Sequence, residues 1–376
     1  MHIGLLIYGD INTLSGGYLY DRKLVDYLRS QGDSVEIISL PEKSYPGSLL
    51  STEIPEAIRI SNEGENNKFD ILVQDELVHP SCFGINKKLK SLLGCPIVSL
   101  VHLLKCSVPA PLFKKTLIAY FEKKYLQSVD GLVLNSQSTK AAAEKLLGEK
   151  LPAHIVAVPC ADHFPENDAQ DAKQTYDGSG IFRILFVGNI SRQKGLHVLI
   201  DAMAKLDDAK VSLTVVGEEN IDPGYMAELR NKLNSYRYHK QVIFKGRQSG
   251  EALQALYLEH DVFIMPSVNE AYGIAFLEAL QFGLPVIATS QGGSKEFVRH
   301  GENGYLIEPD DSKQLAELIS SLKGNDQQLQ LLSDKAIASF KQHPRWQDSC
   351  NKIRDFLQMM VEKNHNSMKN FRDSPL

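Results

Sequence analysis

The sequence predicts an α/β protein made of two doubly wound domains in series. Short apolar runs alternate along the chain with longer runs of helical period, which indicates repeated strand–helix–strand units. Several apolar runs are continuous in Val, Ile and Leu, as is typical of parallel strands buried on both faces. The pattern breaks once, at a polar segment over residues 162–180, and then restarts. We therefore expect a first domain over residues 1–165, a second over residues 180–344, and a linker between them.

Each half of the chain carries six candidate strands. In the first half they are Ile3–Tyr8, Val35–Leu40, Phe69–Gln74, Pro96–His102, Gly131–Asn135 and His154–Pro159. In the second half they are Phe182–Val187, Val211–Val216, Gln241–Phe244, Asp261–Met265, Pro285–Ala288 and Tyr305–Ile307. Helical period is found at Tyr18–Ser30, Leu112–Ser128, Thr139–Leu147, Leu196–Leu206, Ala252–His260, Gly273–Phe282, Ser294–His300, Leu315–Lys323, Gln327–Gln342 and Trp346–Lys363.

Composition excludes several classes of protein. The formal net charge is -5, from 41 basic and 46 acidic residues, which argues against a protein that grips nucleic acid through its phosphates. The five cysteines form no C-x-x-C pair, so we expect reduced, buried thiols. The N-terminus lacks the pattern of a signal peptide and no apolar stretch reaches 18 residues, so we expect a cytoplasmic protein.

Ligands of doubly wound sheets bind beyond the carboxyl ends of the strands. With two such domains facing each other, we expect the active site in the cleft between them. The pattern by itself also fits a dehydrogenase or a periplasmic binding protein, although the latter would need a signal peptide.

The strongest local signal lies in residues 267–280, which read SVNEAYGIAFLEAL. They follow a predicted strand and open a helix at Gly273, where free backbone N–H groups form a ready anion site. Glu270 precedes this helix and Glu278 lies inside it. Two carboxylates placed in this way can accept hydrogen bonds from sugar hydroxyls, although Glu278 could equally be a solvated or capping residue.

This segment resembles the donor-site motif of the family-4 retaining glycosyltransferases (glycosyl transferases group 1), which have the GT-B fold. The motif is two glutamates separated by seven residues, with an internal Tyr-Gly. Further blocks agree in order, and the resemblance covers most of residues 182–310: LFVGNISRQKG from residue 185, VIFKG from residue 242, FGLPVIAT from residue 282 and GGSKE from residue 292.

The resemblance implies a role for each matching residue. Lys194 would hold the donor diphosphate with help from Arg192, and Glu278 would bind the ribose hydroxyls. Glu270 would hold the transferred sugar. The remaining donor-binding positions implied are Gly188, Asn189, the backbone of Gly273, Ile274 and Ala275, and Arg247 near the base.

The first half resembles the family more loosely. Gly17, in a glycine pair that opens a helix, would approach the phosphate, and His102 at a strand end would face the donor sugar. Without the resemblance, these two residues would be read as a simple turn and a polar strand end. The family's last helix returns to the first domain, and residues 345–363 carry an apolar stripe that would complete it in this way.

One departure from the family concerns the phosphate loop. The family often has arginine directly after the glycine of this loop, where this chain has Asn189. Either Arg192 replaces that arginine or donor affinity is lower. No Asp-x-Asp metal motif ends a strand, so we expect no metal and no cofactor. Asp75 and Glu76 do end a strand in the other half, and we expect them to be solvated rather than to face the acceptor.

The expected reaction is therefore metal-independent transfer of a hexosyl group from a nucleotide diphosphate sugar, UDP- or GDP-linked, to an acceptor hydroxyl with retention. The alternatives are a nucleotide-sugar epimerase or hydrolase on the same fold, and a nucleotide-sugar binding protein without turnover. The sequence names neither the sugar nor the acceptor, which could be a glycan, a lipid or a small molecule.

A basic stretch over residues 113–126, FKKTLIAYFEKKYL, could touch an anionic membrane surface. We expect instead that its helix buries an apolar stripe on the sheet and leaves its lysines in water.

Overall fold

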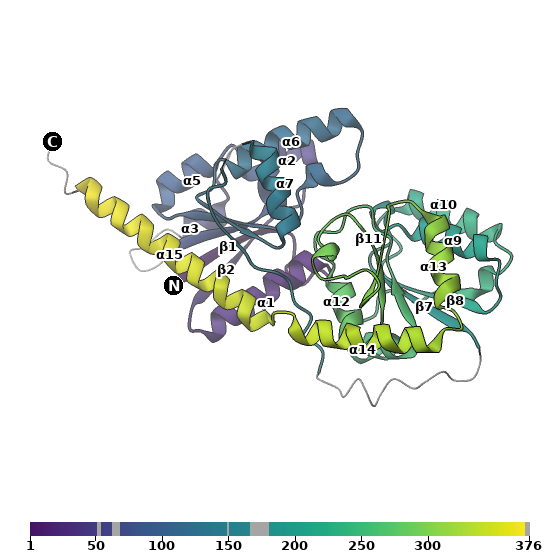
Figure 1. Ribbon diagram of the computed structural model, residues 1–376. Coiled ribbons are helices and arrows are strands. Elements are labelled where there is room, and N and C mark those ends of the chain that lie inside the picture. The colour runs from purple at the N-terminus through teal and green to yellow at the C-terminus, as the bar shows by residue number, and fades with distance from the viewer. Residues whose placement is uncertain (51–53, 62–67, 149, 166–179, 373–376) are drawn as a thin grey trace. The chain divides into compact units, whose positions relative to one another are not determined.

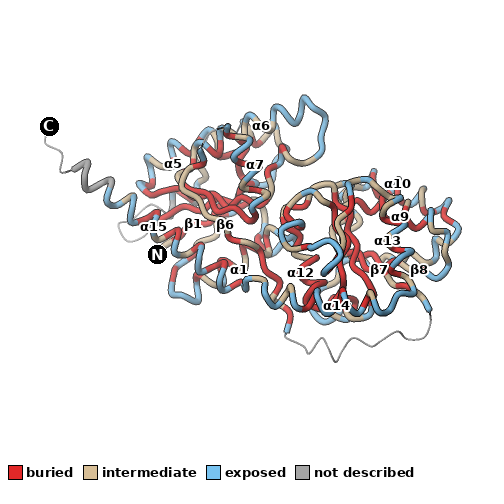
Figure 2. The backbone as a smooth tube through the Cα atoms, in the orientation of Figure 1, coloured by how far each residue is buried: buried red, intermediate tan, exposed pale blue. Residues whose placement is uncertain are grey.

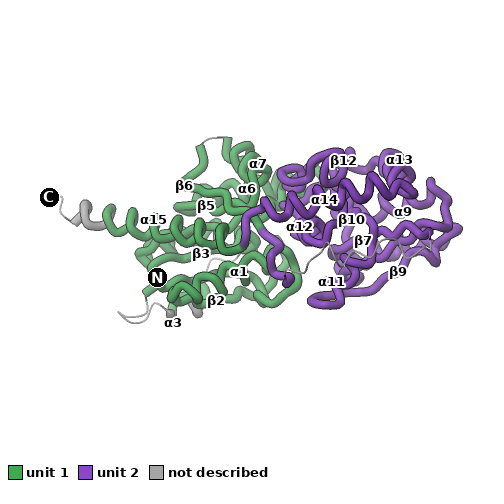
Figure 3. The backbone as a smooth tube through the Cα atoms, turned by 60° about the horizontal axis from the view of Figure 1, so that its bottom comes forward, with its two compact units in different colours: residues 1–159, 346–376 green, residues 160–345 purple. Residues whose placement is uncertain are grey.

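The computed structural model describes residues 1–50, 54–61, 68–148, 150–165 and 180–372. The chain divides into two compact units, coloured separately in Figure 3. Unit 1 comprises Met1–Pro159 and Trp346–Leu376, and unit 2 comprises Cys160–Arg345.

Unit 1 contains a six-stranded parallel sheet in the order β2-β1-β3-β4-β5-β6. Its strands are β1 His2–Tyr8, β2 Ser34–Leu40, β3 Ile71–Asp75, β4 Ile97–Val101, β5 Gly131–Leu134 and β6 Ala153–Val156. Every residue of β3, β4 and β5 is buried. This burial explains why these strands read as continuous apolar runs rather than as alternating ones.

The helices of unit 1 lie on both faces of this sheet (Figure 1). They are α1 Gly16–Ser30, α2 Tyr45–Leu49, α3 Glu56–Ser61, α4 His79–Cys82, α5 Asn86–Leu93, α6 Leu112–Leu126 and α7 Gln137–Leu147. Serines define two of the starts, because Ser15 accepts a hydrogen bond from the Tyr18 N–H and Ser136 accepts one from the Thr139 N–H.

Unit 2 contains a second six-stranded parallel sheet, in the order β12-β11-β10-β7-β8-β9. Its strands are β7 Phe182–Val187, β8 Val211–Val216, β9 Val242–Phe244, β10 Val262–Ile264, β11 Val286–Thr289 and β12 Gly304–Ile307. Its helices are α9 Leu196–Leu206, α10 Pro223–Asn234, α11 Gly250–Glu259, α12 Ile274–Gln281, α13 Ser312–Leu322 and α14 Asp326–Gln342. Both units are thus doubly wound, as the sequence predicted.

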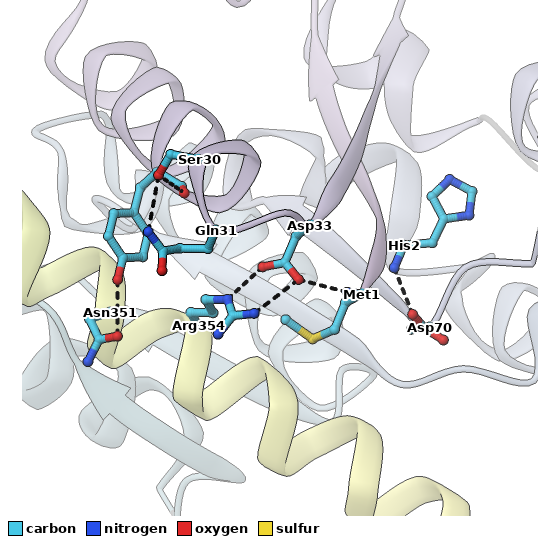
Figure 4. A network of polar contacts seen from close by, with 9 residues as sticks. Met1, His2, Ser30, Gln31, Asp33, Asp70, Asn351 and Arg354 are labelled. Atoms are coloured by element: carbon cyan, nitrogen blue, oxygen red, sulfur yellow. Dashed lines mark hydrogen bonds and ion pairs between the residues drawn. The ribbon is translucent and has the colours of Figure 1, made fainter.

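The last helix, α15 Trp346–Arg372, belongs to unit 1 and is longer than the 345–363 expected from the sequence. Figure 4 shows how polar contacts tie it to α1 and to the start of β2. The buried carboxylate of Asp33 accepts hydrogen bonds from Arg354 Nε at 2.7 Å and from the Met1 ammonium at 2.7 Å. Tyr27 Oη donates to Asn351 Oδ1 at 3.0 Å. Burial raises the pKa of Asp33, but these cations outweigh burial and hold that pKa below its usual range.

All twelve predicted strands are present, within a few residues at each end. The helix predicted over Ser294–His300 is wrong, because only a 3-10 turn forms there, at Ser294–Glu296. Next to this turn, the Gly293 N–H donates to Glu270 O at 2.8 Å, and the Arg299 N–H donates to the side-chain Oδ1 of Asn303 at 2.8 Å. Most of the predicted linker lies outside the described residues. All five cysteines are free and buried, as expected.

Candidate active site

Each sheet has one topological switch point, where the chain leaves neighbouring strands in opposite directions. In unit 2 this point lies between β7 and β10, since β7 leads to β8 on its other side. In unit 1 it lies between β1 and β3. Ligands of open α/β sheets bind beyond the strand ends at such points. The candidate residues fall there: the loops after β7 and β10 carry most of the unit 2 set, and the helix after β1 carries Gly17.

Lys194 and Glu270 meet at the switch point of unit 2. Lys194 Nζ lies 2.6 Å from Glu270 Oε2, although the two residues are 76 positions apart in the chain. Their side chains are 22% and 10% exposed, so the pair is largely withdrawn from water. A Cβ added to Gly188 would lie 3.8 Å from Lys194 Cδ, which places this glycine beside the lysine stem. The structure therefore places a cation and a carboxylate side by side where a ligand would bind.

The backbone of Glu270 is held by a glycine pair that the sequence marked only as part of the family pattern. Gly292 forms a parallel bridge with Glu270, and the Gly293 N–H donates to Glu270 O at 2.8 Å. Gly292 has a φ of +89°, and a Cβ there would lie 2.3 Å from Glu270 O. A side chain at this position would displace the loop that carries Glu270.

Helix α12 begins close to Glu270, and no side chain caps the N–H groups of its first turn. Gly273, with a φ of +96°, precedes Ile274 and Ala275, the first residues of the helix. Uncapped N–H groups at a helix start carry partial positive charge and favour an anion. Glycine is required here, because an added Cβ would lie 2.5 Å from Phe276 Cδ2.

Glu278 is buried inside α12 and both of its carboxylate oxygens have partners. Tyr257 Oη donates to Oε2 at 2.6 Å, and His163 Nε2 lies 3.0 Å from Oε1. Burial, and then the charge of Glu278, raise the pKa of Tyr257, so its hydroxyl remains a donor. Sequence reasoning placed Glu278 but missed Tyr257 and His163, which come from outside the recognised motif.

The two predicted arginines pair with acidic side chains other than Glu270. Arg192 forms an ion pair with Glu228 of α10, and its guanidinium lies 5.1 Å from the centroid of the Tyr225 ring. Arg247 Nε lies 2.9 Å from Oε2 of Glu218, a residue in the loop that follows β8. Asn189 follows Gly188 at the end of β7.

His102 lies in a buried acidic cluster in unit 1. Its Nε2 is 3.1 Å from Asp21 Oδ1, and its backbone N–H donates to Glu76 Oε2 at 2.7 Å. A Cβ added to Gly17 would lie 3.5 Å from the His102 ring, so these two predicted residues are neighbours. The expectation that Asp75 and Glu76 are solvated is wrong, because they are only 1% and 4% exposed. Their loop turns inward, where Glu76 accepts hydrogen bonds from the backbone of His102 and Leu103.

The cluster holds more protons than isolated side chains would. Burial lowers the pKa of His102, but the nearby charges of Asp21, Glu76 and Asp75 outweigh it and raise that pKa to about 10. Burial raises the pKa of Glu76 to about 7. Burial, and then the charge of Asp21, raise the pKa of Asp75 well above its usual range. At neutral pH the cluster therefore contains an imidazolium at His102.

The second half of the chain is similar to a known protein family. Residues 169–339 match the sequence model of the family described as "Glycosyl transferases group 1". The chain carries a group 1 glycosyltransferase domain.

Relatives with glycosyltransferase names and one solved structure are similar to this chain. An uncharacterized glycosyltransferase of Methanocaldococcus jannaschii is 35% identical over 133 residues, which span 35% of this chain but only 33% of that relative. A D-inositol 3-phosphate glycosyltransferase of Pseudarthrobacter chlorophenolicus is 27% identical over 298 residues, or 75% of this chain and 69% of the relative. The solved structure of Anabaena HepE in complex with UDP-glucose has a TM-score of 0.74 at 19% identity and covers 96% of this chain and 100% of that one. The fold of this chain is GT-B.

One group of side chains in unit 1 has the composition of a metal site. Among the described residues, Asp21, Asp75 and His102 each offer a ligand atom, and these atoms lie within 4.8 Å of one another. They belong to unit 1, whereas the predicted diphosphate ligand Lys194 belongs to unit 2.

Asp21 is the residue of this cluster that sequence reasoning missed. It lies on α1 and is fully buried. The available signal was its position, because Tyr18, Asp21, Val25 and Leu28 share one face of α1 and the other three are apolar. A charge on the buried stripe of a helix calls for a partner, and here that partner is His102.

Proposed function

We propose that the protein transfers a sugar from a nucleotide diphosphate donor to an acceptor hydroxyl, with retention of anomeric configuration and without a metal ion. The observation that carries the proposal is the Lys194–Glu270 pair, with its 2.6 Å separation, beside the uncapped start of α12 at a topological switch point. The names of the relatives and the UDP-glucose in the HepE structure support a nucleotide sugar as the donor.

The reaction breaks the bond between the anomeric carbon and the diphosphate, and negative charge grows on the leaving group. In the proposed site Lys194 and the N–H groups of Ile274 and Ala275 face that charge. Preorganised donors of this kind stabilise developing charge more than the ground state. The ammonium that now binds Glu270 would turn to the diphosphate, which frees the Glu270 carboxylate to accept hydrogen bonds from the transferred sugar.

Glu278 would bind the ribose. Its two oxygens already accept from Tyr257 and His163, but a carboxylate has about four lone-pair positions and can accept further hydroxyl donors. Tyr257 and His163 would fix its orientation. In unit 1, Gly17 lies next to His102, which is an imidazolium at neutral pH. Retention follows from attack of the acceptor on the face from which the diphosphate departs. The acceptor oxygen bonds to the anomeric carbon as the bond to the diphosphate breaks, and the hydroxyl proton passes to the departing diphosphate oxygen.

The donor is the part of this proposal that can be tested first. Purified protein is heated with UDP-, GDP- and ADP-sugars in turn, in excess EDTA. A donor present at about 100 times its Kd stabilises the folded state by roughly 2.7 kcal/mol, which gives a clear rise in Tm. We expect a UDP- or GDP-sugar to give the largest rise.

Products formed from that donor then separate transfer from its alternatives. A sugar joined to an added acceptor supports the proposal. An epimerised sugar nucleotide, or free sugar that forms at the same rate with any acceptor, would indicate an epimerase or hydrolase. Binding without any turnover across the acceptor panel would indicate a binding protein.

A further inference from the structure

The first turns of α6 form an exposed apolar and basic projection from unit 1. We define the α6 tip as residues 109–117, PAPLFKKTL, and every residue of it is exposed. Leu112 and Phe113 are each 79% exposed, and Leu117 is 41% exposed. Figure 2 shows this stretch in pale blue beside the α6 label. Large apolar side chains this open to water and adjacent in sequence indicate an interaction site.

The tip departs from the expectation that the whole helix would bury one apolar stripe on the sheet. The helix packs on the core only from Ile118 onward, and Tyr125 and Leu126 are fully buried. The carboxylate of Glu122 accepts hydrogen bonds from the backbone of Lys105 and Cys106. Packing on the core of unit 1 therefore does not explain why Leu112, Phe113 and Leu117 are apolar.

The charge of the tip is positive in a protein whose net charge is -5. Lys114 and Lys115 directly follow Phe113, and residues 105–121 contain no Asp or Glu. The next acid, Glu122, is buried and bonded to backbone N–H groups, so it does not screen these lysines. Adjacent apolar and basic side chains match an anionic lipid surface, where apolar groups enter the headgroup boundary and lysines bind phosphates.

The size of the tip also favours a bilayer over a protein partner. A stable protein interface takes roughly 20–30 residues from each side, which is far more than the tip presents. A bilayer surface needs only a few inserted side chains near basic groups. Among the described residues no helix is long and apolar enough to cross a membrane, so contact at the surface is the mode that this part of the chain allows.

We propose that the α6 tip docks on an anionic lipid bilayer, with Leu112 and Phe113 in the headgroup boundary and Lys114 and Lys115 on lipid phosphates. The tip begins seven residues after His102 in the chain. Docking there would suit an acceptor carried by a lipid, an extension that rests on the proposed function. Docking itself does not depend on the reaction.

Co-sedimentation of the full chain with vesicles tests the proposal directly. The vesicles are phosphatidylcholine alone, or phosphatidylcholine with phosphatidylglycerol, at low and high salt. The tip variants are Leu112→Ser with Phe113→Ser, and Lys114→Gln with Lys115→Gln. The matched control is Leu331→Ser with Lys335→Gln, which alters an exposed leucine and an exposed lysine on α14 of unit 2.

We expect the wild type to bind anionic vesicles at least about tenfold better than neutral ones, and less at high salt. The serine variant should lose about tenfold or more of this binding, and the glutamine variant should lose the preference for anionic lipid. The control should bind as the wild type does, and all three variants should keep the wild-type Tm because the altered side chains are exposed.

The proposal is overturned if the wild type does not sediment with anionic vesicles, or if the tip variants bind them as the wild type does. It is also overturned if the serine variant instead changes the mass of the protein in lipid-free ultracentrifugation, since the tip would then join copies of this chain.

Discussion

At the scale of single residues, the Lys194–Glu270 pair makes the clearest prediction about rate. Lys194→Ala should lower kcat/KM on the order of 10²–10³-fold, because the lost cation meets charge that appears only as the bond breaks. Asn189→Ala removes a neutral side chain and should cost about 1 kcal/mol, as for an ordinary hydrogen bond. Steady-state kinetics on the donor from the thermal screen measures both. If kcat/KM of Lys194→Ala stays within about threefold of wild type while Asn189→Ala loses most of its activity, the diphosphate site is misassigned.

Arg192 can be assigned by combining its alanine variant with that of Lys194. The structure pairs Arg192 with Glu228 rather than with Glu270, so the arginine would have to leave that partner to reach the diphosphate. If both cations act on one phosphate, the two losses in kcat/KM should not add. Additive losses would show that Arg192 acts independently of Lys194.

The His102 cluster makes a prediction about pH and stability. The folded state holds the pKa of His102 at about 10, above its usual 6.5, so this group stabilises the fold fully below pH 6.5 and loses that effect as pH rises. Between pH 6.5 and 8 the unfolding free energy should fall, by at most about 1.4 kcal/mol per pH unit for each proton held. Asp75 and Glu76, whose folded pKa values are also raised, act with the same sign.

Asp21→Asn is the variant that isolates this effect. It removes the charge that most raises the pKa of His102 and that also raises the pKa of Asp75. Urea unfolding at pH 6.5, 7.2 and 8.0 should therefore show a shallower fall for this variant than for the wild type. Equal slopes in the two proteins would mean that the cluster does not hold the extra protons.

At the scale of elements, the sequence predicted the sheets better than the loops and helix ends. The buried parallel strands carry their own signal, since both faces demand Val, Ile or Leu and strands such as Phe182–Val187 have no polar face. The segment Ser294–His300 has helical spacing, yet the Gly293 N–H just before it donates to Glu270 O, and the Arg299 N–H donates to the side chain of Asn303. Glu270 belongs to another loop, so the helical spacing of the segment gives no sign of that contact.

Some residues of the candidate site could likewise be predicted from the sequence, and others could not. Lys194, Glu270 and Glu278 could be predicted because they sit in a motif with fixed spacing. Asp21, Tyr257 and His163 could not be predicted from that motif, because each meets its partner only through the tertiary fold. Of these three residues, only Asp21 had a signal in the sequence, because it is a charged residue on the apolar face of α1.

Helix α15 makes the prediction that belongs to this scale. Phe356 is 5% exposed, and a Cβ added to Gly131 would lie 3.0 Å from its Cζ, so the ring packs against β5. Phe356→Ala should lower the unfolding free energy by about 3–5 kcal/mol, through lost burial and the cavity left behind. Met359→Ala on the same helix is the control, because that side chain is 45% exposed and its loss should cost less than about 0.5 kcal/mol. Equal, small costs in urea unfolding would show that α15 does not belong to the core of unit 1.

At the scale of the whole molecule, each unit has a cluster of chemical groups at its own switch point. The unit 2 cluster has Lys194 and the start of α12 for an anion, and the unit 1 cluster is acidic around His102. Since cationic groups already face the proposed diphosphate position, we predict that transfer persists in excess EDTA. Complete loss of activity, restored by magnesium or manganese, would contradict this. If Asp75→Asn then abolished the restored activity, the metal would be assigned to Asp21, Asp75 and His102.

The central claim is retaining transfer from a nucleotide sugar, and the configuration of the first product tests it most directly. The measurement is a proton NMR time course in EDTA, with an α-linked nucleotide sugar chosen by the thermal screen and an acceptor that yields product. The account predicts that the anomeric signal of the first product has the α configuration of the donor. A first product with the β configuration would contradict it.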